Sequence, residues 1–193
     1  MALEVPVFGQ RASECGNTSL KAVLWFHGMR LSARRLGRMV GVSQLGTDHG
    51  GLVRGALAAG AHAFERTGGT VGELRWFAQR GYPVIVGWWS RDEGDAHFDP
   101  RWPLGERRAR DCGHYSVVTG VTGRRVALVD PQWQMRGGRW RVVGHTSMPR
   151  AAFLSVWYDT DGPRYGRVDR WYLVVHRSDL RFGGRFPGTD HVP

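Results

Sequence analysis

A chain of 193 residues is long enough to bury a core of its own, and its length predicts a single domain. Hydrophobic residues make up 41% and charged residues 23%, which excludes a wholly disordered chain, and two cysteines are too few for a disulfide scaffold. The formal net charge is +10, but the arginines are scattered instead of forming the runs typical of nucleic-acid-binding arms. We therefore do not expect nucleic acid as a partner.

No stretch of the sequence reaches the roughly 18 apolar residues that a membrane span needs. Residues 1–10 also lack the basic and apolar regions of a secretory signal. We therefore expect a cytoplasmic protein without a membrane segment, in which the cysteines are thiols. The sequence does not indicate an oligomeric state.

Apolar residues recur at helical spacing in four segments of the N-terminal half. The first helix is expected from Cys15 to His27, with Ser13 as its N-cap and Gly28 at its end. The other three helices are expected from Ser32, near Leu52–Ala59 and near Val71–Gln79.

From Pro83 onward the pattern changes to short apolar strands, with a polar loop between Ser90 and Cys112. One further helix is expected over Pro149–Trp157. Helices followed by mostly antiparallel strands predict the α+β class, with a helical N-terminal half packed on a sheet from the C-terminal half. The expected strands are Val84–Val86, His114–Val121, Val126–Asp130, Trp140–Val143 and Arg170–His176.

Gln10 and Cys15 stand at the start of the first expected helix. A helix N-terminus favours the thiolate form of a cysteine. If the preceding loop folds back, the Gln10 amide and the Cys15 N–H can together bind an oxyanion. A small buried cysteine without a catalytic role explains this segment equally well.

His114 and Asp130 lie on two strands that Thr122 and Gly123 join. A register that pairs residue 114 with 130, and 118 with 126, would place both side chains on one face, and a shift by one residue would separate them. Asp130 could then hold one ring nitrogen of His114 while the other faces Cys15. Each residue alone is better explained as a core histidine and a turn aspartate, but Gln, Cys, His and Asp in this order favour catalysis.

Three segments resemble the papain-like cysteine peptidases of the bacteriocin-processing family, which cleave after double-glycine leaders: Gln10–Leu20, Gly113–Gly120 and Val126–Pro131. The resemblance extends roughly over Val5–Val175. It implies a single papain-like peptidase domain over residues 1–181, a loose tail over 182–193, no cofactor and a peptide or protein substrate. It also implies four roles, namely Cys15 as nucleophile, His114 as general base and acid, Asp130 as the residue that orients His114, and Gln10 in the oxyanion hole.

The chain differs from that family in two ways. Family members that process bacteriocins are usually fused to a transporter, whereas this sequence contains no membrane or ATPase segment. Asn17 and Thr18 also stand where the family often has small residues such as Pro-Ala. The sequence therefore predicts a stand-alone relative and does not predict its cleavage specificity.

Trp88, Trp89 and Trp133 follow strands that should border the cleft, and they are candidate walls of a substrate site or parts of the core. Cys112 lies two residues before His114 and could form a disulfide with Cys15 on oxidation. Asp95, His97 and Asp99 are metal-ligand types, but no third or fourth His or Cys stands at metal spacing, so we expect no metal site.

Three functions remain open. The first is a cysteine peptidase or amide hydrolase that acts on an extended peptide, and the sequence favours it. The second is an acyl- or peptidyl-transferase that uses the same triad. The third is a non-catalytic basic protein that binds nucleic acid, since residues 32–57 have the look of a helix-turn-helix.

Overall fold

The computed structural model describes residues 2–44, 46–90, 112–161 and 166–177. The predicted loop after Ser90, the candidate ligands Asp95, His97 and Asp99, and the predicted tail from residue 182 lie outside these ranges. The helices are α1 (Cys15–Phe26), α2 (Ala33–Val40), α3 (His49–Ala58), α4 (Val71–Gln79) and α6 (Arg150–Val156). The strands are β1 (His62–Arg66), β2 (Val84–Ser90), β3 (Cys112–Val121), β4 (Arg125–Arg136), β5 (Arg139–Pro149), β6 (Tyr158–Thr160), β7 (Arg167–Asp169) and β8 (Tyr172–His176).

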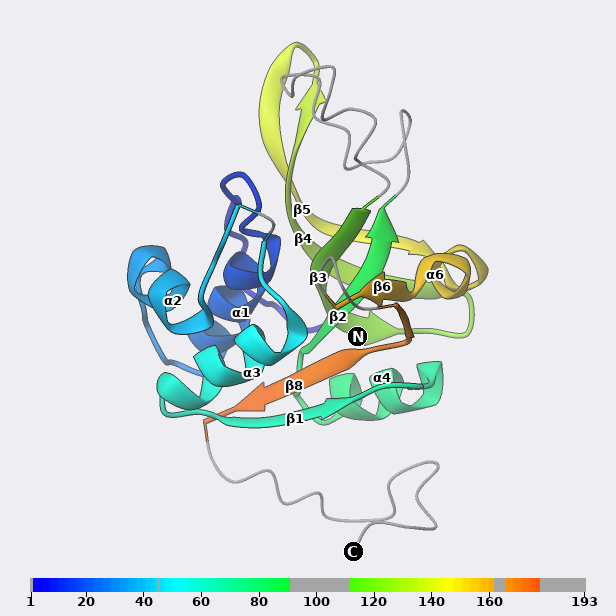
Figure 1. Cartoon of the computed structure of the whole chain (residues 1–193). Coiled ribbons are helices and arrows are strands. Elements are labelled where there is room, and N and C mark those ends of the chain that lie inside the picture. The colour runs from blue at the N-terminus through cyan, green and yellow to red at the C-terminus, as the bar shows by residue number, and fades with distance from the viewer. Residues whose placement is uncertain (1, 45, 91–111, 162–165, 178–193) are drawn as a thin grey trace, which may run out of the picture.

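The predicted α+β class is confirmed. Six strands form one antiparallel sheet in the order β1-β8-β2-β3-β4-β5, and β6 pairs with β7 in a separate two-stranded sheet. The helices α1, α2 and α3 lie together on one side of the large sheet, while α4 and α6 lie on the other (Figure 1). All five predicted helices are present, whereas β1, β6 and β7 were not predicted.

Each layer of helices has its own apolar core. One core contains Leu20, Leu36 and Leu52, one from each of α1, α2 and α3. These residues pack on the face of the sheet to which the Tyr115 side chain points. The second core lies between α4, α6 and the opposite face, and includes Phe77, Val118 and Leu128. The central strands β2, β3 and β8 are therefore buried on both faces.

The helices α2 and α3 belong to the first core and do not form a helix-turn-helix. Residues 41–48 separate them, which is longer than the ~3–4-residue turn of that motif. Their apolar residues Leu36 and Leu52 are fully buried.

The N-terminus of α1 differs from those of α2, α3 and α4. The N-cap side chains of those three helices accept a backbone N–H from the first turn, as the physics of capping requires. At α1 the N-cap residue is Glu14, whose side chain makes no such bond. Ser13, the predicted N-cap, has a φ of 59° and donates its hydroxyl to the Gln44 carbonyl at 2.8 Å, so that prediction is wrong.

The hairpin of β3 and β4 decides where their polar side chains point. Val118 pairs with Leu128, whereas the sequence predicted its pairing with Val126. The predicted register is therefore wrong by two residues. Because side chains alternate with a period of two, a shift of two residues leaves the side chains of β3 up to Val118 on their predicted faces, whereas Val121, which pairs with Val126, changes face.

A bulge at Thr119 sets this register. On the turn side of the bulge Val121 pairs with Val126, and the extra residue in β3 moves all later pairs by one. Without the bulge the total shift would be odd, and His114 and Asp130 would lie on opposite faces of the sheet. The irregularity therefore brings these two side chains to the same face.

No helix in the described part of the chain has the length and apolar character needed to cross a membrane.

Candidate active site

Cys15 is the first residue of α1, at a helix end that has no side-chain cap. Its free thiol belongs to a half-buried residue, and the helix dipole and the first N–H groups favour a negative charge at this position. The hydroxyl of Ser19, one helical turn further on, donates to the Tyr115 carbonyl at 3.1 Å. Because Tyr115 follows His114, this bond fixes where Cys15 lies relative to the imidazole.

A glycine after Cys15 lets α1 approach β3 closely. A Cβ atom on Gly16 would lie 3.1 Å from the Tyr115 ring and 3.2 Å from Leu52. A larger residue would push the N-terminus of α1 away from the strand that carries His114.

His114 and Asp130 form a buried hydrogen-bonded pair, with 3.0 Å between the imidazole Nε2 and the carboxylate Oδ1. Both residues are at least 95% buried. The side chain of Cys15 also acts on the imidazole, since it contributes to the raised pKa of His114. Since Asp130 engages Nε2, Nδ1 is the ring nitrogen left for the thiol, and the structure brings these three predicted residues together.

The charge of His114 is set by its two partners. Burial lowers the pKa of the imidazole, but the charge and hydrogen bond of Asp130, together with Cys15, outweigh this effect and raise the pKa from 6.5 to about 10. His114 is therefore protonated at neutral pH.

Asp130 is held by the backbone that follows it. The same Oδ1 accepts the N–H of Gln132 at 2.9 Å, at a second bulge that lies between Asp130 and Trp133 in β4. The Asp-Pro step therefore does not end the strand, which continues to Arg136. The bulge ties the carboxylate down and directs its oxygen toward His114.

Gln10 lies against the same bulge. Its N–H donates to the Pro131 carbonyl at 2.9 Å, and its carbonyl accepts the Trp133 indole N–H at 2.9 Å. The side-chain Oε1 is buried and has no hydrogen-bond partner among the described residues. The structure therefore brings Gln10 beside Asp130, on the segment that leads into Cys15.

The three tryptophans of the predicted substrate walls have different surroundings. Trp88 is 2% exposed, lies edge-on to the His114 ring at 5.5 Å, and donates its N–H to Ser116 Oγ at 3.1 Å. Trp89 is half-buried and stacks on Tyr158, and half-buried Trp133 holds the Gln10 segment. Only the latter two, of the three, offer appreciable surface to a substrate.

A second buried histidine and carboxylate, His49 and Asp159, were missed by the sequence analysis. The His49 Nε2 lies 3.6 Å from Asp159 Oδ2, and both residues are at least 95% buried. His49 follows Asp48, the N-cap of α3, and therefore looked like an ordinary residue of a helix start. The sequence signal that could have indicated the pair is Gly113, the glycine directly before His114.

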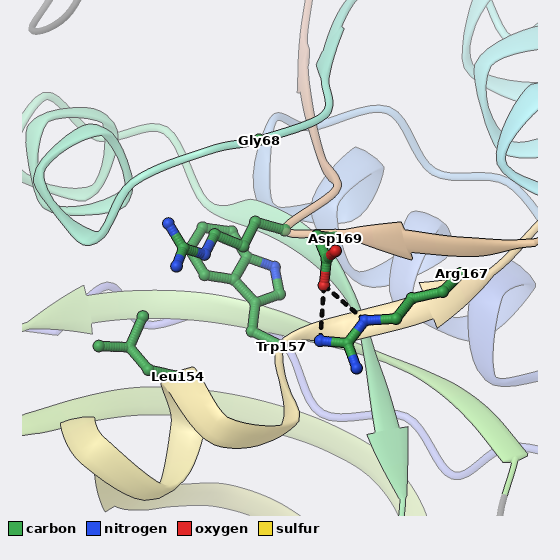
Figure 2. A pocket seen from close by; sticks show the side chains of 6 residues that line it. Gly68, Leu154, Trp157, Arg167 and Asp169 are labelled. Carbon is green, nitrogen blue, oxygen red and sulfur yellow. Dashed lines mark hydrogen bonds and ion pairs between the residues drawn. The ribbon is translucent and has the colours of Figure 1, made fainter.

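A hollow of about 420 Å³ lies between β7, α6 and the loop before α4 (Figure 2). None of the predicted catalytic residues lines it. Arg167 and Asp169 form an exposed ion pair at its rim, with 2.7 Å between the guanidinium and the carboxylate. The residues around the hollow are Gly68, Leu154, Trp157, Arg167, Asp169 and Arg170.

The arrangement at Cys15 has the order of groups that nucleophilic catalysis needs: a thiol, an imidazole and a carboxylate linked in sequence. Cys15 is a free thiol, and the side chain of Cys112 lies outside the described residues, so the suggested disulfide stays a prediction. Among the side chains that the structure describes, no group of three or more His, Cys, Asp or Glu could hold a metal ion.

Solved structures share this fold. The peptidase domain of Streptococcus ComA, a bifunctional ABC transporter of a quorum-sensing pathway, matches with a TM-score of 0.61 at 18% identity, over 90% of this chain and 98% of that domain. A protein from Bacillus anthracis named as a C39-like peptidase matches with a TM-score of 0.60 at 19% identity, over 91% of this chain and 96% of that one. A double glycine motif protease from an AMS/PCAT transporter, solved with a leader peptide, matches with a TM-score of 0.56 at 19% identity, over 90% and 92% of the two chains.

These identities are low enough that the structural matches show the fold alone. No curated protein matches the chain. The model of the Peptidase_C39 like family, however, matches residues 2–164, which is most of the sequence. The chain therefore belongs to the Peptidase_C39 like family and is a cysteine peptidase of papain-like fold.

Proposed function

We propose that this peptidase cleaves an extended peptide through a triad of Cys15, His114 and Asp130, with Gln10 in the oxyanion hole. Cys15 is the nucleophile, His114 moves the proton, and Asp130 holds the imidazole in one orientation. The observation that carries the proposal is the buried 3.0 Å bond between His114 Nε2 and Asp130, with the Cys15 side chain acting on the same ring.

The resting state follows from the charge of His114. Its raised pKa of about 10 keeps the ring protonated at neutral pH, and an imidazolium stabilises a thiolate beside it. The uncapped N-terminus of α1 adds a favourable potential at the same sulfur. Both effects stabilise the negative charge that the sulfur carries when it attacks.

In the first half-reaction the thiolate attacks the carbonyl carbon of the scissile amide, and a carbon–sulfur bond forms. The carbonyl oxygen takes up the negative charge, which the Cys15 N–H and the Gln10 amide stabilise. His114 donates its proton to the amide nitrogen as the carbon–nitrogen bond breaks. The amine leaves, and an acyl-enzyme remains.

In the second half-reaction water attacks the thioester while His114 accepts its proton. The carboxylic acid leaves, and the thiolate and imidazolium are restored. The Gln10 side chain acts in the oxyanion hole through its Nε2 amide hydrogens, because its Oε1 can only accept a hydrogen bond.

Trp88 shelters the His114–Asp130 bond in this proposal. Its ring meets the imidazole at an interplanar angle of 84° and is itself buried. A bond kept from water is stronger than an exposed one because the local dielectric is low. Trp89 and Trp133 remain candidate substrate walls.

A peptide is the proposed substrate, because the relative solved with a leader peptide shares the fold over most of both chains. Cleavage should be sought with a panel of extended peptides that includes double-glycine sequences. The masses of the products, measured with and without an added amine, separate hydrolysis from acyl or peptidyl transfer.

Alkylation by iodoacetamide tests the triad without a known substrate. At pH 6 we expect Cys15 to react at least about tenfold faster than Cys112, as read by peptide mass spectrometry. The variant His114→Gln should lose this excess. Equal, slow rates at both cysteines of the wild-type chain would overturn the proposed function.

A further inference from the structure

The side chain of Asp159 occupies a notch in the sheet directly behind His114. Gly87 of β2 and Gly113 of β3 lie on the same face of the sheet, and neither carries a Cβ. A Cβ on Gly87 would lie 2.6 Å from Asp159 Oδ2, and one on Gly113 would overlap the Asp159 carboxylate. The carboxylate therefore fills the space that the two glycines leave open.

The carboxylate is fixed in this notch by its surroundings. Oδ1 accepts the N–H of Thr160 at 2.7 Å, and Oδ2 faces the His49 ring at 3.6 Å. That ring stacks flat on Trp171 with 4.0 Å between centroids, and its backbone N–H donates to Asp161 at 2.8 Å. The residues around the carboxylate come from α3, from β6 and the residue after it, and from the residue before β8.

The notch lies on the face of β3 opposite to the His114 side chain. Trp88 pairs with His114 and shares its face, whereas Gly113 and Tyr115 point to the other side. Asp159 therefore contacts the strand at the residue immediately before His114. It can fix the backbone from which the imidazole projects.

Asp159 also contributes charge near the imidazole. Burial raises the pKa of Asp159 above its ordinary value, and the partners His49 and Thr160 and the positive charge of His114 offset only part of this rise. The titratable groups that face this carboxylate are His49 on α3, His114 and Tyr115 on β3, and Asp161 after β6. Two further groups, Cys15 on α1 and Asp48 before α3, act on the same Tyr115. On the paired strand β7, Arg167 and Asp169 are exposed and bind each other (Figure 2).

We propose that Asp159, held by His49, is a positioning residue for His114: it fixes the end of β3 through the notch at Gly87 and Gly113 and places a second negative charge behind the imidazolium. The assignment rests on the proposed triad, because it gives His114 a catalytic task. It adds to that triad a carboxylate on the opposite face of the strand. The substrate does not contact Asp159, which is 2% exposed.

The isosteric variant Asp159→Asn tests the charge. We expect the pKa of His114, followed by NMR of carbon-labelled imidazoles in the full chain, to fall by about one unit. The kcat for a peptide that the wild type cleaves should fall about tenfold, with KM little changed. Asp169→Asn is the matched control, since it removes an exposed carboxylate from the neighbouring strand and should leave both values as in the wild type.

A pair of variants at the notch tests the packing. Gly113→Ala alone introduces a Cβ that overlaps the carboxylate and should reduce kcat. In an Asp159→Ala background the overlapping atoms are gone, so the same substitution should cost at least about threefold less activity. Melting temperatures of all variants, measured in parallel, separate loss of folding from loss of positioning.

The outcomes distinguish the two proposals. If wild-type Cys15 reacts no faster than Cys112, the proposed function fails. If Cys15 is reactive, but Asp159→Asn leaves the His114 titration and kcat unchanged and Gly113→Ala has the same effect in both backgrounds, the role of Asp159 is overturned and the triad stands.

Discussion

Two buried histidine–aspartate pairs lie on opposite faces of β3, and among the side chains that the structure describes, a thiol lies beside the first pair alone. His114 and Asp130 are joined by a 3.0 Å hydrogen bond, whereas the atoms of His49 and Asp159 are 3.6 Å apart. Each ring also has its own tryptophan. Trp88 meets His114 edge-on at 84°, and Trp171 stacks on His49 at 4°.

The second ring nitrogen makes the difference between the two pairs. In His114 it is left for Cys15, while in His49 Nδ1 lies 3.6 Å from the Asp161 carboxylate. The His49 ring therefore lies between two carboxylates, and none of the described side chains beside it is a nucleophile from which it could take a proton. In the two proposals, the same pair of residue types therefore serves proton transfer on one face of β3 and support on the other.

The strongest test of this comparison is to replace each of the two histidines, one at a time, by glutamine. His114→Gln should lower kcat/KM for a cleaved peptide by on the order of 10²–10⁴-fold, because general acid and base catalysis is lost. His49→Gln should lower it by less than about tenfold, since it only loosens Asp159. The measurement is the initial rate at a temperature well below both melting transitions, and equal losses would remove the distinction between the faces.

The carboxylate of the first pair gives the next largest effect. Asp130→Asn should lower kcat by roughly 10²-fold or more, because the imidazole loses both its orientation and its charge partner. Asp130 raises the pKa of His114, so its removal should shift the alkaline limb of the activity profile from about pH 10 to lower pH. The pH profile and the NMR titration of His114 check this, with Asp169→Asn as the control. An unshifted limb would contradict the orienting role.

Much of the first pair could be predicted from local signals. A cysteine at a helix start and a histidine at a strand start depend on nearby residues, and α1 and α4 lie close to their predicted ranges. The register of β3 and β4 was wrong by two residues because the bulge at Thr119 leaves no clear local mark. The faces of His114 and Asp130 were still right, since the error was even.

The second pair could not be predicted because it depends on contacts between distant elements. Asp159 lies in a strand of three residues, and His49 lies near the start of a helix about a hundred positions earlier in the chain. Their meeting place exists because Gly87 and Gly113 come together when β2 pairs with β3. A glycine in a strand suggests a close approach, but it does not say what approaches.

Substitutions of the two tryptophans beside the histidine rings, Trp88 and Trp171, should have smaller effects on the rate. Trp88→Phe loses the bond to Ser116, and Trp171→Phe loses the bond to Glu65, each 3.1 Å long. Each variant should therefore lose about 1 kcal/mol of unfolding free energy, measured in urea. Trp88→Phe should also lower kcat, because its ring shelters the His114–Asp130 bond, and by more than Trp171→Phe, which acts only through His49 and Asp159. A similar drop in both variants would mean that stability and not shelter decides the rate.

A third histidine, His27, is half-buried and has no carboxylate partner among the described residues, and it gives the smallest contrast. Burial and then the charge of His176 lower the pKa of His27 to about 4, against a smaller opposing effect of the Val175 backbone. In the unfolded chain His27 is protonated as the pH falls through 6.5, whereas in the folded chain it is protonated only at about pH 4. His27 therefore makes the free energy of unfolding fall as the pH drops through this window. His27→Gln should flatten that fall in urea titrations between pH 6.5 and 4, whereas His145→Gln, on the exposed side of β5, should not.

His114 has the opposite sign, because its raised pKa contributes stability below pH 6.5 that is lost as the pH rises through about 10. If His27→Gln kept the full acid sensitivity of the wild type, a neighbouring carboxylate would not be what separates a raised from a lowered imidazole pKa in this fold.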